Sequence, residues 1–359
     1  MKKIIQSAQV NQPHQLAETS SNSIMQPMMD YNENSTMQAH INEDGIVILR
    51  KIVQHLAPNI TSTFSIGDFG CSHGGNSMIS INAILDAMQE TRRNDGPLSI
   101  QVYHNDLPIN DFREVFKCLN DPELTYQNHE ITKANPGNRI FSMMSGKSFY
   151  SQCFPNALLD LSFSFNSIHW MPDIGVTLYR PLMVYSKHVS EEQLSLIQDV
   201  AQKQFVTFLS CRAKELRKGG KLVISLLGDF GNLGGIDDIW QQHINEYNID
   251  PSLLGYTLIP LIARTKENVV QAIHEVPSLE LIHYIDNMFE NVRGRNSDHL
   301  KAIFWPQLYT GLVKGAVFDD EAKLTKFLDE FFSKLSTLYT ASENVAATIR
   351  YVAIEKVAD

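Results

Sequence analysis

The sequence is poor in cysteine, in long apolar runs and in positive charge, and each shortage excludes a class of protein. Its four cysteines are scattered among 359 residues without a C-x-x-C pair, and a chain of this size needs no disulfides, so we expect a reducing compartment. No segment approaches the roughly 18 apolar residues of a membrane-spanning helix. The first residues hold too short an apolar stretch for a secretory signal. These absences predict a cytoplasmic protein that does not bind membranes.

The negative net charge of the chain excludes further classes of binding partner. The chain has 40 acidic and 30 basic residues, and its formal net charge of −10 repels nucleic-acid phosphates and anionic lipids. Hydrophobic residues make up 43% of the sequence, which is enough for one large domain or two unequal ones. We therefore expect a globular protein that does not bind nucleic acid.

Strand-like and helix-like segments alternate along most of the chain. Apolar runs suited to strands occur in "STFSIGDFG", "LSIQVYHNDLP", "NALLDLSFSF", "KLVISLLGD" and "NVAATIRYVAIEKV". Helical periodicity begins at Gly45, Asn76 and Leu194, and we expect the last of these helices to be capped by Gly219 and Gly220. This alternation predicts an α/β fold, in which a mostly parallel sheet carries helices on both faces.

Composition also divides the chain into parts. Residues 1–27 are polar and read as a loose N-terminal leader. Residues 28–230 together with 333–359 contain the predicted strands and form the α/β domain. Residues 231–332 are mainly helical by pattern, and we expect them to form a cap over the sheet.

The stretch "DFGCSHGGNS" (Asp68–Ser77) places glycines between the first predicted strand and a helix, where backbone N–H groups can approach a ligand. It is not a P-loop, because Asn76 stands where the lysine is required. It also lacks the G-x-G-x-x-G spacing of dinucleotide sites, which disfavours a nicotinamide dehydrogenase. Asp68 at the end of the strand would repel a pyrophosphate and attract a cation.

S-adenosylmethionine satisfies these requirements, because it carries an ammonium and a sulfonium and no phosphate. A second acid is then needed after the next strand to accept hydrogen bonds from the ribose hydroxyls, and Asp106 in "YHNDLP" supplies it. The alternative is that Asp68 and Asp106 each cap a helix or a turn.

Seven motifs in a fixed order resemble one known family. They are "DYNENSTMQ", "DFGCSHGGNS", "HNDLPINDF", "SGKSFYSQCFP", "NSIHWMP", "LRKGGKLVISLLG" and "DIW". Together they resemble the SABATH methyltransferases, which use S-adenosylmethionine to methylate carboxylic acids such as salicylic, benzoic, jasmonic or indole-acetic acid. Some members methylate purine ring nitrogens instead. The resemblance implies a class I methyltransferase fold, which is Rossmann-like, with a mainly helical cap and commonly a homodimer.

The resemblance also implies two sets of site residues. Around the cofactor it places Tyr31, Ser35, Asp68, Cys71, Asn76, Asp106, Leu107, Ser148 and Phe149. Around the acceptor it places Gln38, Asn166, His169, Trp170, Ile239, Trp240, Ile262, Leu300 and Ile303. Tyr31 and Ser35 would belong to a lid over the cofactor. Several members of both sets, Phe149 and Cys71 among them, are equally expected in a core.

The implied reaction transfers a methyl group to the carboxylate of a small aromatic or indolic acid and gives a methyl ester and S-adenosylhomocysteine. Trp170 and Gln38 offer neutral donors to the carboxylate, which only accepts hydrogen bonds. A carboxylic acid with a pKa of about 4 is already ionised at neutral pH, so no catalytic base is needed and His169 orients the acceptor or forms the pocket wall. If the acceptor is a ring nitrogen, His169 assists its deprotonation. A relative that binds ligands without turnover is a further alternative.

The sequence departs from the plant members of the family at several positions. The stretch matching a magnesium-associated segment is "YTLIP" (Tyr256–Pro260), without the acid and the asparagine of that segment, so no metal is predicted. Asn166 stands where a tyrosine or serine is usual. These departures indicate a divergent member and leave the acceptor open.

Overall fold

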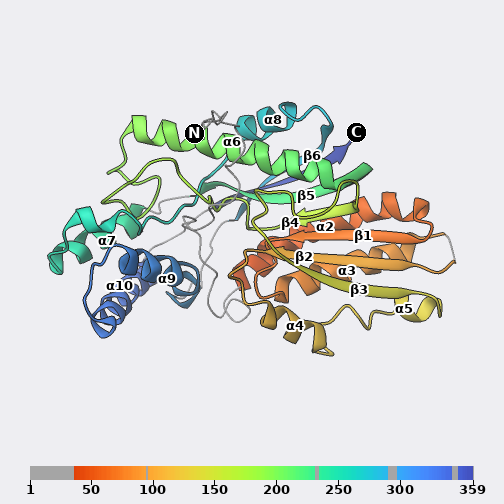
Figure 1. The fold of residues 1–359 in the computed structure, drawn as a ribbon, viewed down its shortest axis with the longest axis horizontal. Helices are drawn as coiled ribbons and strands as arrows, with labels where there is room; N and C mark the ends of the chain where they lie inside the picture. Colours follow the sequence, from red (N-terminus) through yellow and green to blue (C-terminus); the bar gives the residue numbers. More distant parts are fainter. Residues whose placement is uncertain (1–35, 94–95, 231–233, 290–296, 342–346, 359) are drawn as a thin grey trace, which may run out of the picture.

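The computed structural model describes residues 36–93, 96–230, 234–289, 297–341 and 347–358 (Figure 1). Tyr31 and Ser35 lie outside these ranges. Within them the chain forms one seven-stranded sheet with the strand order β3-β2-β1-β4-β5-β7-β6. The strands are β1 Thr63–Phe69, β2 Ser99–Asp106, β3 Arg139–Gly146, β4 Leu159–Ser164, β5 Leu216–Phe230, β6 Leu279–Phe289 and β7 Ala347–Lys356.

The sheet is mostly parallel, as the sequence predicts. β1 pairs in parallel with β2 and β4, β2 with β3, and β4 with β5, whereas β7 runs antiparallel to both β5 and β6. The chain leaves β1 toward β2 and β3 and then returns to place β4 on the other side of β1. Ligands of such sheets bind at the carboxyl ends of the strands where the order reverses, here beside the end of β1.

Helices cover both faces of the sheet, which confirms the predicted α/β layers (Figure 1). One face is packed by α2 (Thr36–Leu56) and α3 (Gly75–Thr91), and the other by α6 (Glu191–Glu215) and α8 (Lys266–His274). The remaining short helices are α4 Phe112–Asn120, α5 Ile131–Ala134, η2 Ala57–Asn59 and η3 Pro251–Leu254.

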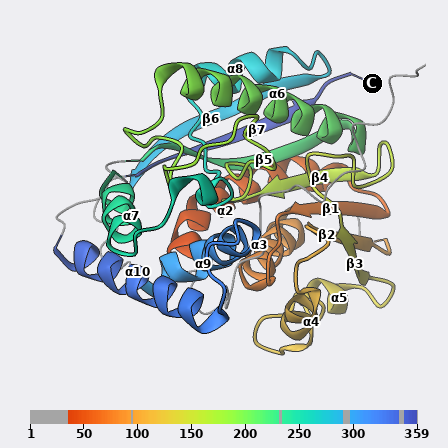
Figure 2. The ribbon, with the colours of Figure 1, turned by 60° about the vertical axis from the view of Figure 1, so that its left-hand side comes forward.

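A separate group of helices lies to one side of the sheet, namely α7 (Gly234–Glu246), α9 (Ser297–Lys314) and α10 (Glu321–Ala341) (Figures 1 and 2). They share their own apolar cluster. The loop after β4 joins this group to the sheet, because Trp170 of the loop forms an isolated β-bridge with Leu261 and packs against the same cluster. This contact brings the helical group next to the carboxyl edge of the sheet.

Several elements differ from the sequence prediction. The sequence analysis predicts neither β3 nor β6, and β6 lies inside the range 231–332 that is expected to be mainly helical. Both are edge strands. Their partly exposed positions include polar side chains, so the apolar pattern of a strand is weak. The prediction that Gly219 and Gly220 cap α6 is wrong. The helix ends at Glu215 because Leu216 already pairs with Leu159 of β4, and Gly219 and Gly220 lie in an irregular stretch of β5.

The helix that begins the described chain also differs from its prediction, because α2 starts at Thr36 rather than at Gly45. No helix in the described ranges is both long enough and apolar enough to cross a membrane.

Candidate functional site

The glycine loop connects β1 to α3 through three residues with positive φ. Gly70, Ser72 and Gly74 have φ values of 85°, 47° and 90°. A Cβ atom on Gly70 would lie 2.3 Å from the hydroxyl oxygen of Ser167, so only glycine fits there. The backbone N–H groups of Gly70 and Cys71 donate to the carbonyl of Asn105 at 2.8 and 3.1 Å. The loop is therefore fixed to the end of β2 and passes close to the segment after β4.

Asp106 organises this loop from the end of β2. Its Oδ2 accepts a hydrogen bond from the Ser72 N–H at 2.6 Å, and its Oδ1 accepts one from the Leu107 N–H at 2.7 Å. Burial raises the pKa of Asp106 to about 6, while these two hydrogen bonds act in the opposite direction. The turn-capping alternative is thus correct for Asp106. It does not exclude a ligand, because a carboxylate oxygen can accept a second hydrogen bond.

Asp68 begins a buried chain of polar side chains. It is 3% exposed, and its Oδ2 lies 2.8 Å from Nδ1 of His104, the residue directly opposite on β2. Nε2 of His104 lies 2.8 Å from the Tyr126 hydroxyl, which in turn lies 2.7 Å from the Ser142 hydroxyl. The sequence analysis did not assign His104 a role. The signal for it was a histidine within a predicted strand, next to a predicted strand that carries an acid near its end.

The side chains of Asp68, Cys71 and His104 lie within 4.8 Å of one another, close enough for a metal site. However, both ring nitrogens of His104 already have hydrogen-bond partners in Asp68 and Tyr126. Burial raises the pKa of the Cys71 thiol well above its usual value, which disfavours the thiolate that binds metals. The cluster is therefore better explained as a hydrogen-bond chain behind the glycine loop.

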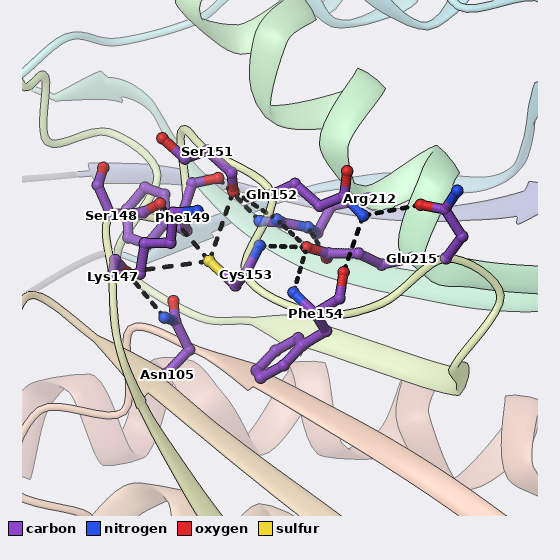
Figure 3. Close-up of polar contacts among 11 residues, drawn as sticks. Asn105, Lys147, Ser148, Phe149, Ser151, Gln152, Cys153, Phe154, Arg212 and Glu215 are labelled. Atoms are coloured by element: carbon purple, nitrogen blue, oxygen red, sulfur yellow. Dashed lines mark hydrogen bonds and ion pairs between the residues drawn. The ribbon is translucent and has the colours of Figure 1, made fainter. Parts of the chain in front are cut away.

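The loop after β3 approaches the glycine loop from the other side. Phe149 is 7% exposed, and its ring meets that of Phe208 on α6 edge-on at 5.8 Å. It also lies within 4 Å of the Cβ position of Gly70. Ser148 beside it is half-buried. The Asn105 side chain donates to the carbonyl of Lys147 (Figure 3) and to that of Ser145, and these bonds fix the start of this loop.

Asn166 lies in the segment after β4 and has a left-handed φ of 55°, which asparagine tolerates better than tyrosine or serine. Its side chain donates to Oδ1 of Asn42 at 2.9 Å, and its N–H donates to the Ser225 hydroxyl at 2.9 Å. Asn166 therefore connects α2 to β5, and this gives a physical reason for the departure from the plant pattern.

His169 and Trp170 follow as two half-buried rings 6.3 Å apart. The His169 carbonyl accepts from the Ile262 N–H at 3.0 Å, and the Tyr150 hydroxyl lies 2.9 Å from the carbonyls of both Ile168 and Trp170. Burial, together with the charge of Arg264, lowers the pKa of His169 to about 3, so the imidazole is neutral at physiological pH.

Arg264 is a buried cation behind this segment, and sequence reasoning missed it. It is 3% exposed, its Nη1 donates to the Ile168 carbonyl at 2.9 Å, and its guanidinium lies 4.9 Å from the centre of the Phe205 ring. Its other polar neighbour is the Tyr150 hydroxyl, and within the described ranges no carboxylate forms an ion pair with it. The signal in the sequence was an arginine directly after the apolar run "LIPLIA".

Most of the remaining predicted acceptor residues come from α7 and α9. Ile239, Leu300 and Ile303 belong to the apolar cluster against which Trp170 packs, and Ile262 is buried in an adjoining cluster. Trp240 is completely buried against Phe327 and Phe331, and its indole N–H has no partner in the described part of the chain.

Two further predicted residues lie at helix starts. Gln38 is in the first turn of α2, with its side chain outside the described part. Asn76 is in the first turn of α3, and its buried Nδ2 has no acceptor among the described residues. An orphaned donor beside the glycine loop is what a bound ligand would satisfy.

Comparisons with known proteins identify the family of this chain. The family model described as "SAM dependent carboxyl methyltransferase" matches residues 26–291. A probable jasmonic acid carboxyl methyltransferase 2 from Theobroma cacao is 33% identical over 209 residues, which are 55% of this chain and 55% of the relative. A 3,7-dimethylxanthine N-methyltransferase 2 from Coffea arabica is 28% identical over 262 residues, which are 66% of each chain. The chain thus spans about half the length of the first of these relatives.

The structure of a loganic acid methyltransferase with SAH superimposes with a TM-score of 0.69 over 93% of this chain and 99% of that one, at 16% identity. This likeness confirms the class I methyltransferase fold that the motifs imply. Since the family model matches more than half of the sequence, the chain belongs to the SAM-dependent carboxyl methyltransferases.

Proposed function

We propose that this protein transfers the methyl group of S-adenosylmethionine to the carboxylate of a small, aromatic or indolic acid. In the reaction a carboxylate oxygen forms a bond to the methyl carbon while the carbon–sulfur bond breaks, and the electron pair stays on sulfur. The products are a methyl ester and S-adenosylhomocysteine. The observation that favours a carboxylate acceptor in this chain is the buried guanidinium of Arg264 behind His169 and Trp170, which has no carboxylate partner among the described residues.

The residues around the glycine loop fit the cofactor. Gly70 allows close approach of the backbone, Asp106 presents a carboxylate where ribose hydroxyls are expected, and Asn76 has a buried donor without an acceptor. We propose that these residues bind the cofactor with Asp68, Cys71, Leu107, Ser148 and Phe149, and that Tyr31 and Ser35 close over it. When bound, S-adenosylmethionine supplies an activated methyl group on a sulfonium.

Arg264 acts on the acceptor through its field rather than by contact. Its Nη1 donates to the Ile168 carbonyl. In this proposal the guanidinium therefore attracts the carboxylate without forming hydrogen bonds to its oxygens. The indole N–H of Trp170 and the amide of Gln38 then orient the carboxylate as neutral donors, and an oxygen keeps the lone pair that attacks. The neutral His169 completes the wall of the pocket beside Trp170.

Because the acceptor is ionised, the protein does not need a catalytic base. Its contribution is alignment and exclusion of water, which together supply roughly 7–11 kcal/mol in well-oriented reactions. The apolar residues Ile239, Trp240, Ile262, Leu300 and Ile303 provide the dry enclosure in this proposal.

Methylation of a heteroaromatic ring nitrogen is the second candidate, and it is favoured by the likeness to the Coffea N-methyltransferases. Incubation with methyl-labelled cofactor and parallel panels of carboxylic acids and purines separates the two. Label on carboxylate oxygens supports the proposal, and label confined to ring nitrogens contradicts it.

We also propose the remaining organisation from these observations. Residues 28–230 with 333–359 would bind the cofactor, and 231–332 would supply the cap, with β6 as the part of that range that joins the sheet. The four thiols, all free in the structure, support a reducing compartment such as the cytoplasm. A homodimer is expected, and light scattering coupled to size-exclusion chromatography tests it.

A further inference from the structure

Two oppositely charged side chains are completely buried near the end of α6. Arg212 and Glu215 are each 0% exposed, with Nε of Arg212 2.7 Å from Oε2 of Glu215 and Nη2 3.0 Å from Oε1. They lie one turn apart on the helix, and they are not among the residues that the family resemblance assigns to the site.

Both members of the pair bind the backbone of one loop, residues 147–154 (Figure 3). The Arg212 guanidinium donates to the carbonyls of Phe149 at 2.8 Å and Ser151 at 3.0 Å. Oε1 of Glu215 accepts from the N–H groups of Cys153 at 2.5 Å and Phe154 at 3.0 Å. The pair thus makes four backbone hydrogen bonds to a loop more than 60 residues away in sequence.

The same guanidinium also contacts the strand that leads into the glycine loop. It lies 3.9 Å from the centre of the Phe69 ring, and Phe69 is the last residue of β1. Phe149 is itself next to Gly70. Arg212 therefore sets the position of the 147–154 loop relative to the glycine loop, which are the two segments between which the nucleoside is proposed to bind.

Packing α6 against the sheet does not require these charges. A buried ion pair is often no more stabilising than apolar residues of the same volume, because both ions lose their hydration. Apolar residues, however, cannot form hydrogen bonds with the two carbonyls and two N–H groups of the buried loop backbone. A planar guanidinium and a carboxylate can, and they do so in one geometry only.

We propose that Arg212 and Glu215 are positioning residues, which hold the 147–154 loop so that Ser148 and Phe149 are ready to bind the nucleoside of the cofactor. This inference rests on the proposed function for the identity of the cofactor. In this inference the pair increases the affinity of the protein for the nucleoside. The pair has no part in recognition of the acceptor or in the transfer step.

The test uses the full-length protein and S-adenosylhomocysteine as the probe, with binding measured by titration calorimetry. Glu215→Gln keeps the size of the side chain and removes the charge, and Arg212→Lys keeps the charge and removes the planar fork. Lys356→Met is the matched control, because Lys356 is a buried cation that binds the carbonyl of Leu216 from β7. Both test variants raise the Kd at least roughly tenfold, as expected when hydrogen bonds to a charged group are lost, whereas the control leaves it unchanged.

Two readouts separate positioning from general loss of stability. Kinetics with a working acceptor show a higher KM for S-adenosylmethionine in the test variants, with the acceptor KM and the kcat at saturating cofactor unchanged. Hydrogen exchange on the unliganded wild-type protein shows protected N–H groups at Cys153 and Phe154, a result that needs no variant to fold.

Wild-type affinity in Glu215→Gln or Arg212→Lys overturns the inference, as do rapidly exchanging N–H groups at Cys153 and Phe154 in the wild-type protein. If the wild-type protein does not bind S-adenosylhomocysteine, the inference and the proposed function both fail. If it binds this nucleoside and methylates no carboxylate, the proposed acceptor fails, and the loss of binding in the two variants still supports the positioning role.

Discussion

The carboxylate of Asp68 lies 2.8 Å from Nδ1 of His104, its direct neighbour across β1 and β2, and both side chains are almost completely buried. The contact fixes the carboxylate at the start of the glycine loop. It continues through Tyr126 to Ser142, so the orientation of one acid depends on a chain of side chains reaching across to β3.

Replacing His104 tests that dependence. In His104→Phe the buried carboxylate of Asp68 and the hydroxyl of Tyr126 lose a partner, which lowers the free energy of unfolding by about 1–3 kcal/mol and weakens binding of S-adenosylhomocysteine. Tyr126→Phe, which leaves the contact between His104 and Asp68 in place, lowers only the stability. Urea denaturation and calorimetry measure the two effects, and equal loss of affinity in both variants would show that His104 has no special relation to the site.

The glycine loop makes a prediction with an internal control. Gly70 and Gly219 both have positive φ, at 85° and 80°, but a Cβ atom would clash with Ser167 only at Gly70 and meets nothing within 4 Å at Gly219. Each alanine variant incurs about 1–2 kcal/mol of left-handed strain, and Gly70→Ala is destabilised by about 1–3 kcal/mol more.

Thermal and urea unfolding measure this difference. Adding Ser167→Gly to Gly70→Ala removes the clashing side chain and should restore most of the additional loss. Equal destabilisation of the two alanine variants would contradict the close approach of Gly70 to Ser167.

Binding of the cofactor should depend on pH through Asp106. Burial raises the pKa of Asp106 to about 6 in the free protein, and ligand hydroxyls donate to the ionised form, so binding lowers this pKa. Affinity is therefore full above pH 6 and falls as the pH drops through about 6, by roughly tenfold per unit once Asp106 is mostly protonated.

Calorimetry in buffers of different ionisation enthalpy detects the corresponding proton, which is released on binding near pH 6. Asp106→Asn binds more weakly and loses this pH dependence. A pH-independent affinity of the wild-type protein between pH 5 and 8 would remove Asp106 from the ribose site. His169, with its pKa lowered to about 3, contributes no inflection in that range.

Arg264 should determine the charge of the acceptor. Removing a buried unit charge near the acceptor weakens its attraction for a carboxylate, so Arg264→Met should raise the KM for a carboxylate acceptor by roughly tenfold, about 1.4 kcal/mol. Affinity for S-adenosylhomocysteine should stay near the wild-type value. The sharper readout compares inhibition by the carboxamide of the same acid, which is neutral. The wild-type protein prefers the acid and the variant does not; an unchanged preference would contradict the electrostatic role.

The sequence predicts those elements whose residues show a clear local pattern, and it fails where a contact between distant residues decides the structure. β1 and α3 follow from a continuous apolar run and a helical stripe, and the glycine loop between them is recognisable from its residues alone. β3 and β6 escape prediction because strands at the sheet edges are only partly buried and mix polar with apolar residues. The end of α6 was misplaced because pairing of Leu216 with β4, a tertiary contact, overrides the glycine signal.

The site shows the same limit. Asp68 and Asp106 could be proposed as site residues because each lies near the end of a strand within a motif. Arg212, Glu215 and Arg264 could not, since their roles come from partners 61–96 residues away and a buried charge has no local signature in sequence.

Mass spectrometry of a panel of carboxylic acids incubated with the protein and methyl-labelled S-adenosylmethionine tests carboxylate methylation directly. We expect one acid, or a narrow group of aromatic or indolic acids, to gain a single labelled methyl group that mild ester hydrolysis releases again. Trp170→Ala should abolish this gain while still binding S-adenosylhomocysteine. Label that appears only on ring nitrogens and resists ester hydrolysis, or unchanged turnover in Trp170→Ala, would contradict it.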